Sequence, residues 1–237
     1  MDSDDSQEGT GRVLGEEWFP VGEISVESMR ERIPGIDYPP TNRIHVWFAR
    51  RPLIASRAAI ASSLFPVGTD RRIILKTLAI PHDRDVVGAH EEVLRAKAEK
   101  RKIKSPFDWP QAYKVPIGED ILRMLENAGI DHPVILDPFS GGGSIPLEAI
   151  RLGLDVVAND LNPVAYLCLK GTVEYPARFG TRLIPEIRTF CEKVHRQAKA
   201  EPEEYYPTSP HEEVYTYLWA RTIRCPHCGL TIPLSPN

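Results

Sequence analysis

Two aspartates that each follow a predicted strand are the residues of this chain best placed to anchor a ligand. Val134 to Leu136 is an apolar run that predicts a short buried strand, and Asp137 ends it. A glycine run then leads into an apolar-periodic segment that predicts a helix, with Gly153 after its last turn. This order of strand, glycine loop and helix would bring backbone N–H groups and a partial positive charge close to the carboxylate of Asp137.

The second aspartate, Asp160, follows a second predicted strand, Asp155 to Ala158. It comes after Asp137 at about the 20-residue offset at which an acidic residue meets ribose hydroxyls in nucleotide-binding βαβ units. The glycine loop lacks the lysine and Ser/Thr ending of a phosphate-binding loop, and an anionic strand end suits an amine better than a pyrophosphate. An amine, a ribose and a helix terminus together indicate S-adenosylmethionine as the ligand.

The residues from Asp137 to Ser144, Asp-Pro-Phe-Ser-Gly-Gly-Gly-Ser, resemble the Asp-Pro-Phe-x-Gly-x-Gly-Ser/Thr cofactor motif of DNA amino-methyltransferases. Together with Asp160-Leu-Asn-Pro and the upstream block Trp47-Phe-Ala-Arg-Arg-Pro-Leu53, they resemble the adenine-specific DNA methylases that carry an inserted zinc ribbon. The resemblance runs in patches from about Trp18 to the C-terminus. It implies a DNA methyltransferase that uses S-adenosylmethionine to methylate the exocyclic amine of adenine.

The resemblance also implies which residues bind the cofactor. The Arg-Pro pair of the upstream block resembles a Lys-Pro element that flanks the methionine end of the cofactor in some DNA amino-methyltransferases, with arginine in place of lysine. The expected cofactor-binding residues are Asp137, Pro138, Phe139, Gly141, Gly143, Ser144, Asp160, Asn162, Arg51 and Pro52.

A Cys-Pro-His-Cys-Gly segment near the C-terminus has the pattern of one zinc knuckle. Cys225 and Cys228 lie between two strand-like runs, and the following glycine permits the tight turn that directs both thiolates at one metal. Its position matches the ribbon of the resembled family. A structural zinc takes about four ligands, so we expect an incomplete zinc site formed by these two cysteines, with His211 and His227 as the nearby substitutes.

No catalytic residue can be assigned from the sequence. In the resembled family an Asp/Asn-Pro-Pro-Tyr/Phe loop accepts hydrogen bonds from the adenine amine and stacks on the flipped-out base. The 237 residues contain no such tetrapeptide, and Asp37-Tyr38-Pro39-Pro40 holds similar letters in the wrong order. We therefore expect a cofactor-binding N-terminal portion that is inactive alone, with DNA and the missing C-terminal part, supplied in trans, as partners.

The sequence is also compatible with two other functions. Asp-Pro-x-x-Gly-x-Gly before an apolar helix also resembles guanine-modifying tRNA methyltransferases. Alternatively, the chain is a non-catalytic fragment that binds cofactor or nucleic acid through the zinc ribbon and a basic helix near residues 91–104. The block at Trp47 to Leu53 and the zinc knuckle favour DNA, whereas the missing catalytic loop favours a non-catalytic role.

The composition sets broad limits on these readings. A net charge of −4 means that DNA contacts must come from a local basic surface. The sequence has no signal peptide and no apolar run of the roughly 18 residues that a membrane span needs, so we expect no membrane partner. Four cysteines, two of them in one Cys-x-x-Cys, do not form a disulfide framework and favour a cytoplasmic location.

The predicted fold class is α/β, an incomplete Rossmann-like S-adenosylmethionine-dependent methyltransferase core with an N-terminal helical region and the start of a C-terminal zinc ribbon. A helix is expected from Pro52, with Arg57 off its core-facing stripe, and Cys168 and Cys191 are expected in the core. The expected segments are a disordered acidic tail (1–17), the helical region (18–117), the cofactor-binding core (118–200), a linker (201–213) and the first half of the zinc ribbon (214–237).

Overall fold

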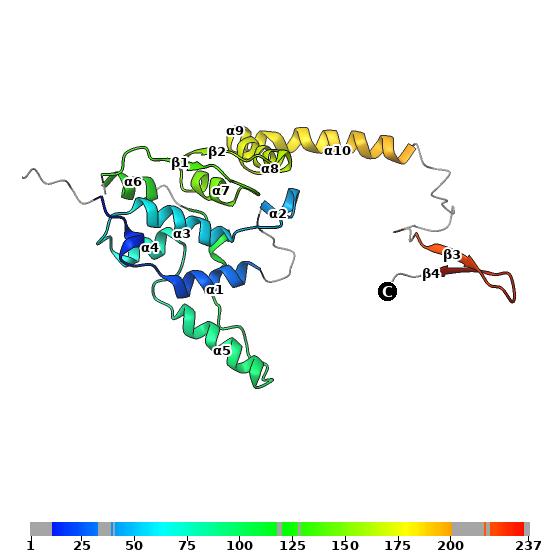
Figure 1. Cartoon of the computed structure of the whole chain (residues 1–237), viewed down its shortest axis with the longest axis horizontal. Helices are drawn as coiled ribbons and strands as arrows, with labels where there is room; N and C mark the ends of the chain where they lie inside the picture. The colour runs from blue at the N-terminus through cyan, green and yellow to red at the C-terminus, as the bar shows by residue number, and fades with distance from the viewer. Residues whose placement is uncertain are drawn as a thin grey trace, which may run out of the picture. The chain divides into compact units, whose positions relative to one another are not determined.

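The computed structural model describes residues 11–32, 39, 41–117, 120–127, 129–200, 216 and 219–234. The chain divides into two compact units, Met1–Gly180 and Thr181–Asn237, which are described separately below (Figure 1). The division falls inside the predicted core segment 118–200.

The first unit begins with helices packed around α3. This helix starts directly after Pro52, as expected, and its apolar residues Ile54, Ala58, Ile60 and Ala61 are buried in the main hydrophobic cluster. It packs against α1 on one side and α7 on another (Figure 1). The helical elements before the first strand are η1 (Leu14–Glu16), α1 (Val21–Glu31), α2 (Thr41–Ile44), α3 (Leu53–Leu64), α4 (Arg71–Thr77), α5 (Val86–Ala98), η2 (Ala112–Lys114) and α6 (Asp120–Asn127).

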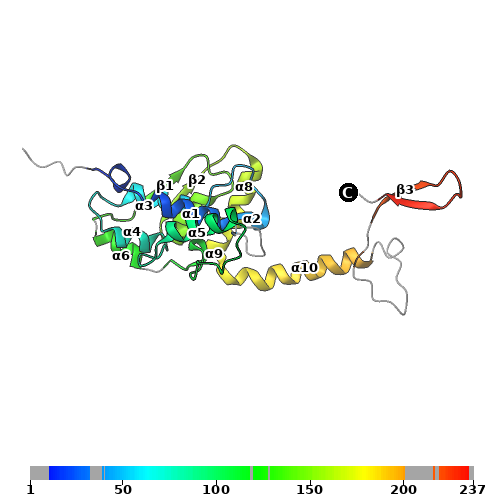
Figure 2. The same cartoon turned by 90° about the horizontal axis from the view of Figure 1, so that it is seen from below.

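The predicted strand–loop–helix–strand unit is present. β1 (Val134–Asp137) and β2 (Asp155–Ala158) are parallel neighbours, with Asp137 opposite Ala158, and α7 (Ser144–Arg151) connects them (Figures 1 and 2). This βαβ connection places the carboxyl ends of both strands at the same sheet edge. The helical elements α8 (Pro163–Leu169), η3 (Lys170–Glu174), α9 (Tyr175–Phe179) and η4 (Gly180–Arg182) follow.

The expectation that the first strand is buried is wrong for half of its side chains. Ile135 and Val156 pack against the hydrophobic cluster, but Val134, Leu136 and Val157 are 58%, 68% and 55% exposed. Side chains alternate between the two faces of a strand, so only the face that packs on the cluster is covered. The described part of this sheet is two-stranded, and the first unit is a mixed arrangement of helices and strands.

Two further expectations for the first unit require correction. Residues 11–17, predicted as part of a disordered tail, include η1 and are attached to the core through Leu14, which is 2% exposed and whose N–H donates to the carbonyl of Phe65 (2.7 Å). Residues 1–10 lie outside the described residues. Arg57, expected off the core stripe of α3, is fully buried because it pairs with Glu148 of α7.

The second unit contains α10 (Leu183–Ala200) and an antiparallel hairpin of β3 (Arg221–Arg224) and β4 (Thr231–Leu234) (Figure 2). The apolar side chains of α10 recur at helical spacing, as predicted. Ile184, Ile187, Phe190 and Val194 are exposed, however, and so is Cys191, which corrects its expected core position. Cys168 of α8 is buried, as expected. The predicted linker, 201–213, lies outside the described residues, and none of the described helices combines the length and apolarity that a membrane crossing requires.

Candidate cofactor site

The ends of the two parallel strands are tied together by backbone hydrogen bonds. The N–H of Asn159 donates to the carbonyl of Asp137, and the N–H of Ser140 donates to the carbonyl of Asn159 (both 2.9 Å). The hydroxyl of Ser140 also donates to the carbonyl of Asp137 (2.9 Å). Ser140 was not among the predicted site residues, because a Ser at the variable position of a motif carries no specific signal. These bonds fix the path of the chain where it leaves β1 and β2.

The carboxylate of Asp160 joins the glycine loop to the end of β2. Its Oδ2 accepts the N–H of Gly141 and its Oδ1 accepts the N–H of Asn162, both at 2.8 Å. The side chain of Asn162 in turn accepts the N–H of Val164 (2.9 Å) and caps α8. The two backbone N–H donors lower the pKa of Asp160. Three of the predicted site residues thus lie in one hydrogen-bonded cluster.

Asp137 lies beside this cluster in a different electrostatic environment. Its side chain is buried, at 8% exposed, and accepts the N–H of Phe139 (3.3 Å). Burial raises the pKa of Asp137, and the nearby negative charge of Asp160 raises it further. Two neighbouring carboxylates at one strand edge repel each other, so a positively charged ligand is favoured there over an anionic one.

The glycines of the loop are required by its geometry. Gly141 and Gly143 have positive φ values of 51° and 84°, and the N–H of Gly143 closes a turn onto the carbonyl of Ser140 (2.8 Å). A Cβ on Gly143 would lie 3.1 Å from Leu169 Cδ2. Gly143 is also the N-cap of α7, and no side chain among the described residues caps it. The first N–H groups of α7 therefore face the loop without a side-chain cap.

A tryptophan that the sequence analysis did not assign packs directly on the glycine loop. A Cβ on Gly141 would lie 2.7 Å from Trp47 Nε1, and a Cβ on Gly142 would lie 2.9 Å from Trp47 Cβ. Trp47 belongs to the upstream block quoted above, but its approach to residues nearly a hundred positions later depends on tertiary packing. Glycine at 141 and 142 thus allows the indole to lie against the loop backbone.

Of the two predicted upstream residues, Arg51 contacts the start of α7 through its backbone. The hydroxyl of Ser144 donates to the carbonyl of Arg51 (3.0 Å), while the side chain of Arg51 is exposed. Pro52 is buried and is the N-cap of α3. The structure therefore brings the backbone of Arg51 to the start of α7, while the Arg51 side chain is exposed.

Three further apolar side chains beside the loop are exposed to solvent. Phe139 is 87% and Leu161 is 98% exposed, one after each acidic strand end, and Pro138 is exposed between Asp137 and Phe139. The carbonyl of Pro138 accepts a hydrogen bond from the Asn159 side chain (3.3 Å). Large apolar groups that flank hydrogen-bonding groups are the usual lining of a small-molecule site.

The two cysteines of the knuckle lie in the turn between β3 and β4. The N–H of Gly229 donates to the carbonyl of Cys225 (2.9 Å), and Gly229 has a positive φ of 73°. Hydrogen bonds from the backbone N–H groups of Cys228 and His227 lower the pKa of the Cys225 thiol. A thiolate is the form that binds zinc. Among the described residues, however, no three His, Cys, Asp or Glu side chains gather as a metal site, so zinc is not confirmed.

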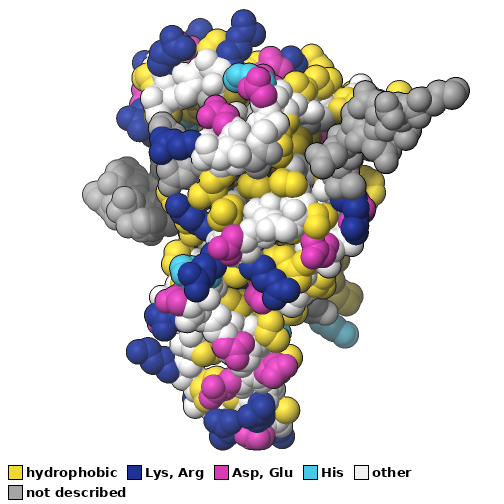
Figure 3. All heavy atoms as spheres, turned by 90° about the vertical axis from the view of Figure 1, so that its left-hand side faces the viewer, with side chains coloured by type: hydrophobic (Ala, Val, Ile, Leu, Met, Phe, Trp, Pro, Cys, Tyr) yellow, Lys and Arg dark blue, Asp and Glu magenta, His cyan; other side chains and the backbone are white. Residues whose placement is uncertain are grey.

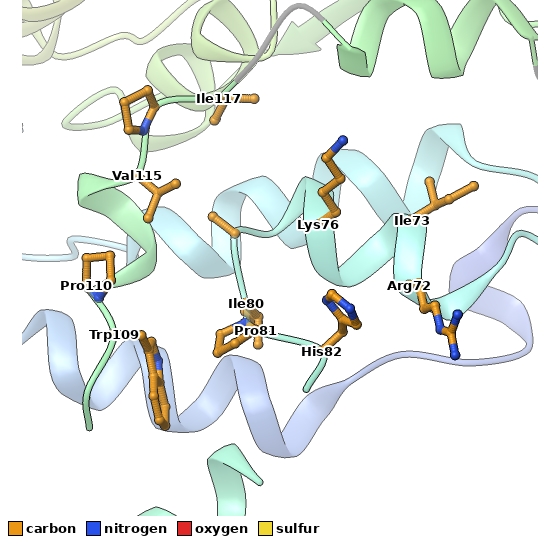
Figure 4. A pocket seen from close by; sticks show the side chains of 12 residues that line it. Arg72, Ile73, Lys76, Ile80, Pro81, His82, Trp109, Pro110, Val115 and Ile117 are labelled. Atoms are coloured by element: carbon orange, nitrogen blue, oxygen red, sulfur yellow. The ribbon is translucent and has the colours of Figure 1, made fainter. Parts of the chain in front are cut away.

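Two cavities of the first unit are lined by residues outside the glycine loop. One, of about 520 Å³, has an apolar lining with Arg72, Lys76 and His82 at its rim, and in Figure 4 Trp109 and Pro110 lie across it from Ile73 and Arg72. A second cavity of about 520 Å³ lies between α7, β2 and α8 and includes Tyr166 and Lys170. Neither cavity is lined by Asp137 or Asp160.

The face of the molecule in Figure 3 has no single block of positive charge. Lys and Arg side chains alternate there with Asp and Glu, including toward the lower end, where α5 extends from the first unit (Figures 1 and 3). This agrees with the acidic net charge of the chain, −4.

Comparison with known proteins separates the chain into two matched regions. Residues 114–220 match the family model of D12 class N6 adenine-specific DNA methyltransferases. Residues 18–80 match a family model described as proteins of unknown function (DUF1156). No curated protein and no solved structure matched the chain. The region that contains the two acidic strand ends, the glycine loop and α8 is therefore similar to an adenine-specific DNA methyltransferase domain, a family that uses S-adenosylmethionine.

Proposed function

We propose that the chain binds S-adenosylmethionine at the ends of β1 and β2 and is the cofactor-binding portion of a DNA methyltransferase that acts on the exocyclic amine of adenine. The observation that carries the proposal is the hydrogen bond between the Gly141 N–H and Asp160 Oδ2 (2.8 Å). It joins the two acidic strand ends and the glycine loop into one site. The match of residues 114–220 supports adenine in DNA as the substrate class.

The residues present suit this cofactor in charge and in shape. The amino-acid end would lie at Asp137 and the backbone of Gly141 and Gly143, where the buried carboxylate gains a positive partner. The ribose would lie on Asp160, whose carboxylate is only partly buried and is already oriented by two backbone donors. Phe139 and Leu161 offer exposed apolar surface for the adenine ring.

The chain's own residues hold and orient the ligand. S-adenosylmethionine, when bound, supplies an activated methyl group on its sulfonium. Ser144 and the carbonyl of Arg51 fix the start of α7 against the upstream segment, and Asn162 fixes the start of α8. No residue of the chain is proposed as catalytic. The group that engages the adenine amine would come from the C-terminal part of such an enzyme, which we propose acts in trans on this portion.

Zinc is a separate part of the proposal. A zinc ribbon binds its metal between two knuckles, and the segment with Cys225 and Cys228 would be one of them. The lowered pKa of Cys225 and the tight turn at Gly229 suit this role. Among the described residues, no third His, Cys, Asp or Glu side chain joins these two thiols as a metal ligand. We therefore propose an incomplete zinc site that needs further ligands.

Isothermal titration calorimetry with S-adenosylmethionine tests the proposed function directly. We expect saturable binding of one cofactor molecule per chain to protein whose fold is confirmed by circular dichroism. ATP is the informative competitor, because an anionic ligand should not displace the cofactor from a site formed by two aspartates. A well-folded chain that shows no heat of binding would overturn the assignment of the site.

A further inference from the structure

The indole of Trp47 lies on the glycine loop at Gly141 and Gly142, between the turn that follows Asp137 and the carboxylate of Asp160. The Cβ positions of Gly141 and Gly142 would each come within 3 Å of Trp47 atoms, at 2.7 and 2.9 Å. Gly141 is also the residue whose N–H binds Asp160. The indole therefore overlies the one backbone segment that connects the turn after Asp137 to the carboxylate of Asp160.

The segment that carries Trp47 is held on both sides within the first unit. Before it, Ile44 packs so closely on Gly171 that a Cβ there would lie 2.7 Å from Ile44 Cδ1. After it, the carbonyl of Arg51 accepts the hydroxyl of Ser144 (3.0 Å). Phe48 packs against the indole with ring centroids 5.2 Å apart. Trp47 is only partly buried, so one part of the ring system remains open to a ligand.

We propose that Trp47 forms the wall of the cofactor site that faces the sulfonium, and that it makes the chain bind S-adenosylmethionine more tightly than S-adenosylhomocysteine. The inference rests on the proposed function. In the cofactor the sulfur lies between the amino-acid end and the ribose. With the first at Asp137 and the second on Asp160, the sulfur must pass Gly141, over which the indole lies.

The chemical difference between the two ligands lies at this atom. The sulfonium carries a positive charge, and the thioether left after methyl transfer is neutral. A cation near the face of an aromatic ring is attracted by the ring quadrupole, and tryptophan gives the strongest such contact. The usual strength of this interaction corresponds to roughly 2- to 30-fold in affinity. Such a preference would also favour release of the neutral product after methyl transfer.

The test compares the two ligands by calorimetry in wild-type protein and three variants. We expect Trp47→Leu to lose roughly 2- to 30-fold in affinity for S-adenosylmethionine while its affinity for S-adenosylhomocysteine stays nearly unchanged. Trp47→Phe should retain part of the preference, because it keeps an aromatic face. Trp219→Leu, which removes an exposed indole from the second unit, is the matched control and should behave as wild type.

The possible outcomes separate this inference from the function on which it rests. Equal losses for both ligands in Trp47→Leu would show an uncharged contact and overturn the sulfonium assignment, as would unchanged binding of both. If wild-type protein binds neither ligand, the proposed function fails and this inference fails with it. Tryptophan fluorescence provides a second readout, since a ligand-dependent change in wild type should be largely lost in Trp47→Phe.

Discussion

Arg57 of α3 donates a hydrogen bond through Nε to Oε2 of Glu148 on α7 at 2.6 Å, and both side chains are completely buried. The other oxygen of Glu148 accepts Arg151 Nη1 (2.6 Å). Arg57 Nη1 also donates to the carbonyls of Leu78 (3.1 Å) and Ala112 (3.3 Å). This ion pair joins the region matched at 18–80 to the region matched at 114–220, and it lies on the helix that begins at the glycine loop.

Removing only the acidic partner of this pair should destabilise the first unit strongly. Glu148→Leu leaves the charge of Arg57 buried without a counter-ion, and burial already lowers the pKa of Arg57. We expect a loss on the order of 3–5 kcal/mol in the free energy of unfolding. The double variant Arg57→Met/Glu148→Leu removes both charges and should recover much of this loss. Urea titration measures both effects, and a Glu148→Leu variant less than about 1 kcal/mol below wild type would contradict the argument.

The local elements around the site were predictable from sequence, and its non-local contacts were not. β1, the glycine loop, α7 and β2 follow from short-range patterns, and the structure has all of them. Arg57 was placed off the core of α3 because helical periodicity treats a charged side chain as outward-facing. Its buried partner lies 91 positions away, a separation that no short-range pattern reports.

The same reason explains the other differences. Trp47 approaches Gly141 through tertiary packing, in which α2 contacts η3 and α3 contacts α7, so this contact was not visible in the motif that contains Trp47. The apolar run Val134 to Leu136 predicted a buried strand, but it could not show that one face of the described sheet is exposed. Cys191 lies on an apolar stripe of α10, and a stripe alone does not show whether anything covers it.

Replacing Asp160 should weaken cofactor binding more than replacing any nearby surface carboxylate. Asp160→Ala removes the proposed charged hydrogen bonds to the ribose and also releases the N–H groups of Gly141 and Asn162. Such bonds are worth on the order of 1.5–3 kcal/mol, so we expect at least ~tenfold weaker binding of S-adenosylmethionine. Asp155→Ala, an exposed position at the start of β2, is the control. Equal affinities in the two variants would refute the ribose assignment but leave the amino-acid end at Asp137 open.

The buried carboxyl of Glu31 should make stability depend on pH. It accepts the N–H of Leu53 (2.8 Å) at the start of α3 and lies 3.5 Å from Arg50, yet burial raises its pKa from 4.5 to about 7. The folded chain then holds a proton at this site between these values that the unfolded chain releases. The free energy of unfolding should therefore fall as pH rises from about 4.5 through 7, by at most about 3 kcal/mol from this group.

The variant Glu31→Gln isolates this contribution. It keeps an oxygen acceptor for the N–H of Leu53 but cannot ionise, so stability between about pH 5 and 8 should change less with pH than in wild type. Chemical denaturation at several pH values gives the slopes. Glu91→Gln, at an exposed position of α5, serves as the control. Parallel slopes in wild type and Glu31→Gln would show that Glu31 is ionised throughout this range.

The purified chain should hold zinc only weakly, because Cys225 and Cys228 supply two of the roughly four ligands that a structural zinc takes. With Cys225 and Cys228 as its two thiol ligands, we expect zinc below one equivalent, readily removed by a chelator. Cys225→Ser should abolish the remaining zinc, whereas Cys191→Ser, which replaces the exposed cysteine of α10, should not change it. Elemental analysis that gives one tightly held zinc per chain would mean that other ligands complete the site.

The chain alone should bind the cofactor without methylating DNA. The amine of adenine is conjugated with its ring and is a poor nucleophile until side-chain and backbone oxygens accept its protons. The Asp/Asn-Pro-Pro-Tyr/Phe loop that supplies these groups in the resembled family does not occur in the 237 residues. General-base and orienting contributions of this kind are typically worth about 10²–10⁴-fold each, so a cofactor site by itself leaves transfer below detection.

A tritium-transfer assay tests this on duplex and single-stranded DNA, with cofactor binding to the same preparation measured in parallel. We expect no transfer by the chain alone, and recovery when a polypeptide that carries the Asp-Pro-Pro-Tyr loop is added in trans, because the exposed face of β1 and β2 leaves room for it to pack. Asp160→Ala should abolish the recovered activity if the cofactor used is the one bound at this site. Methyl transfer by the purified chain alone would contradict the prediction and would make Asp37 to Pro40, which lies largely outside the described residues, the first segment to mutate.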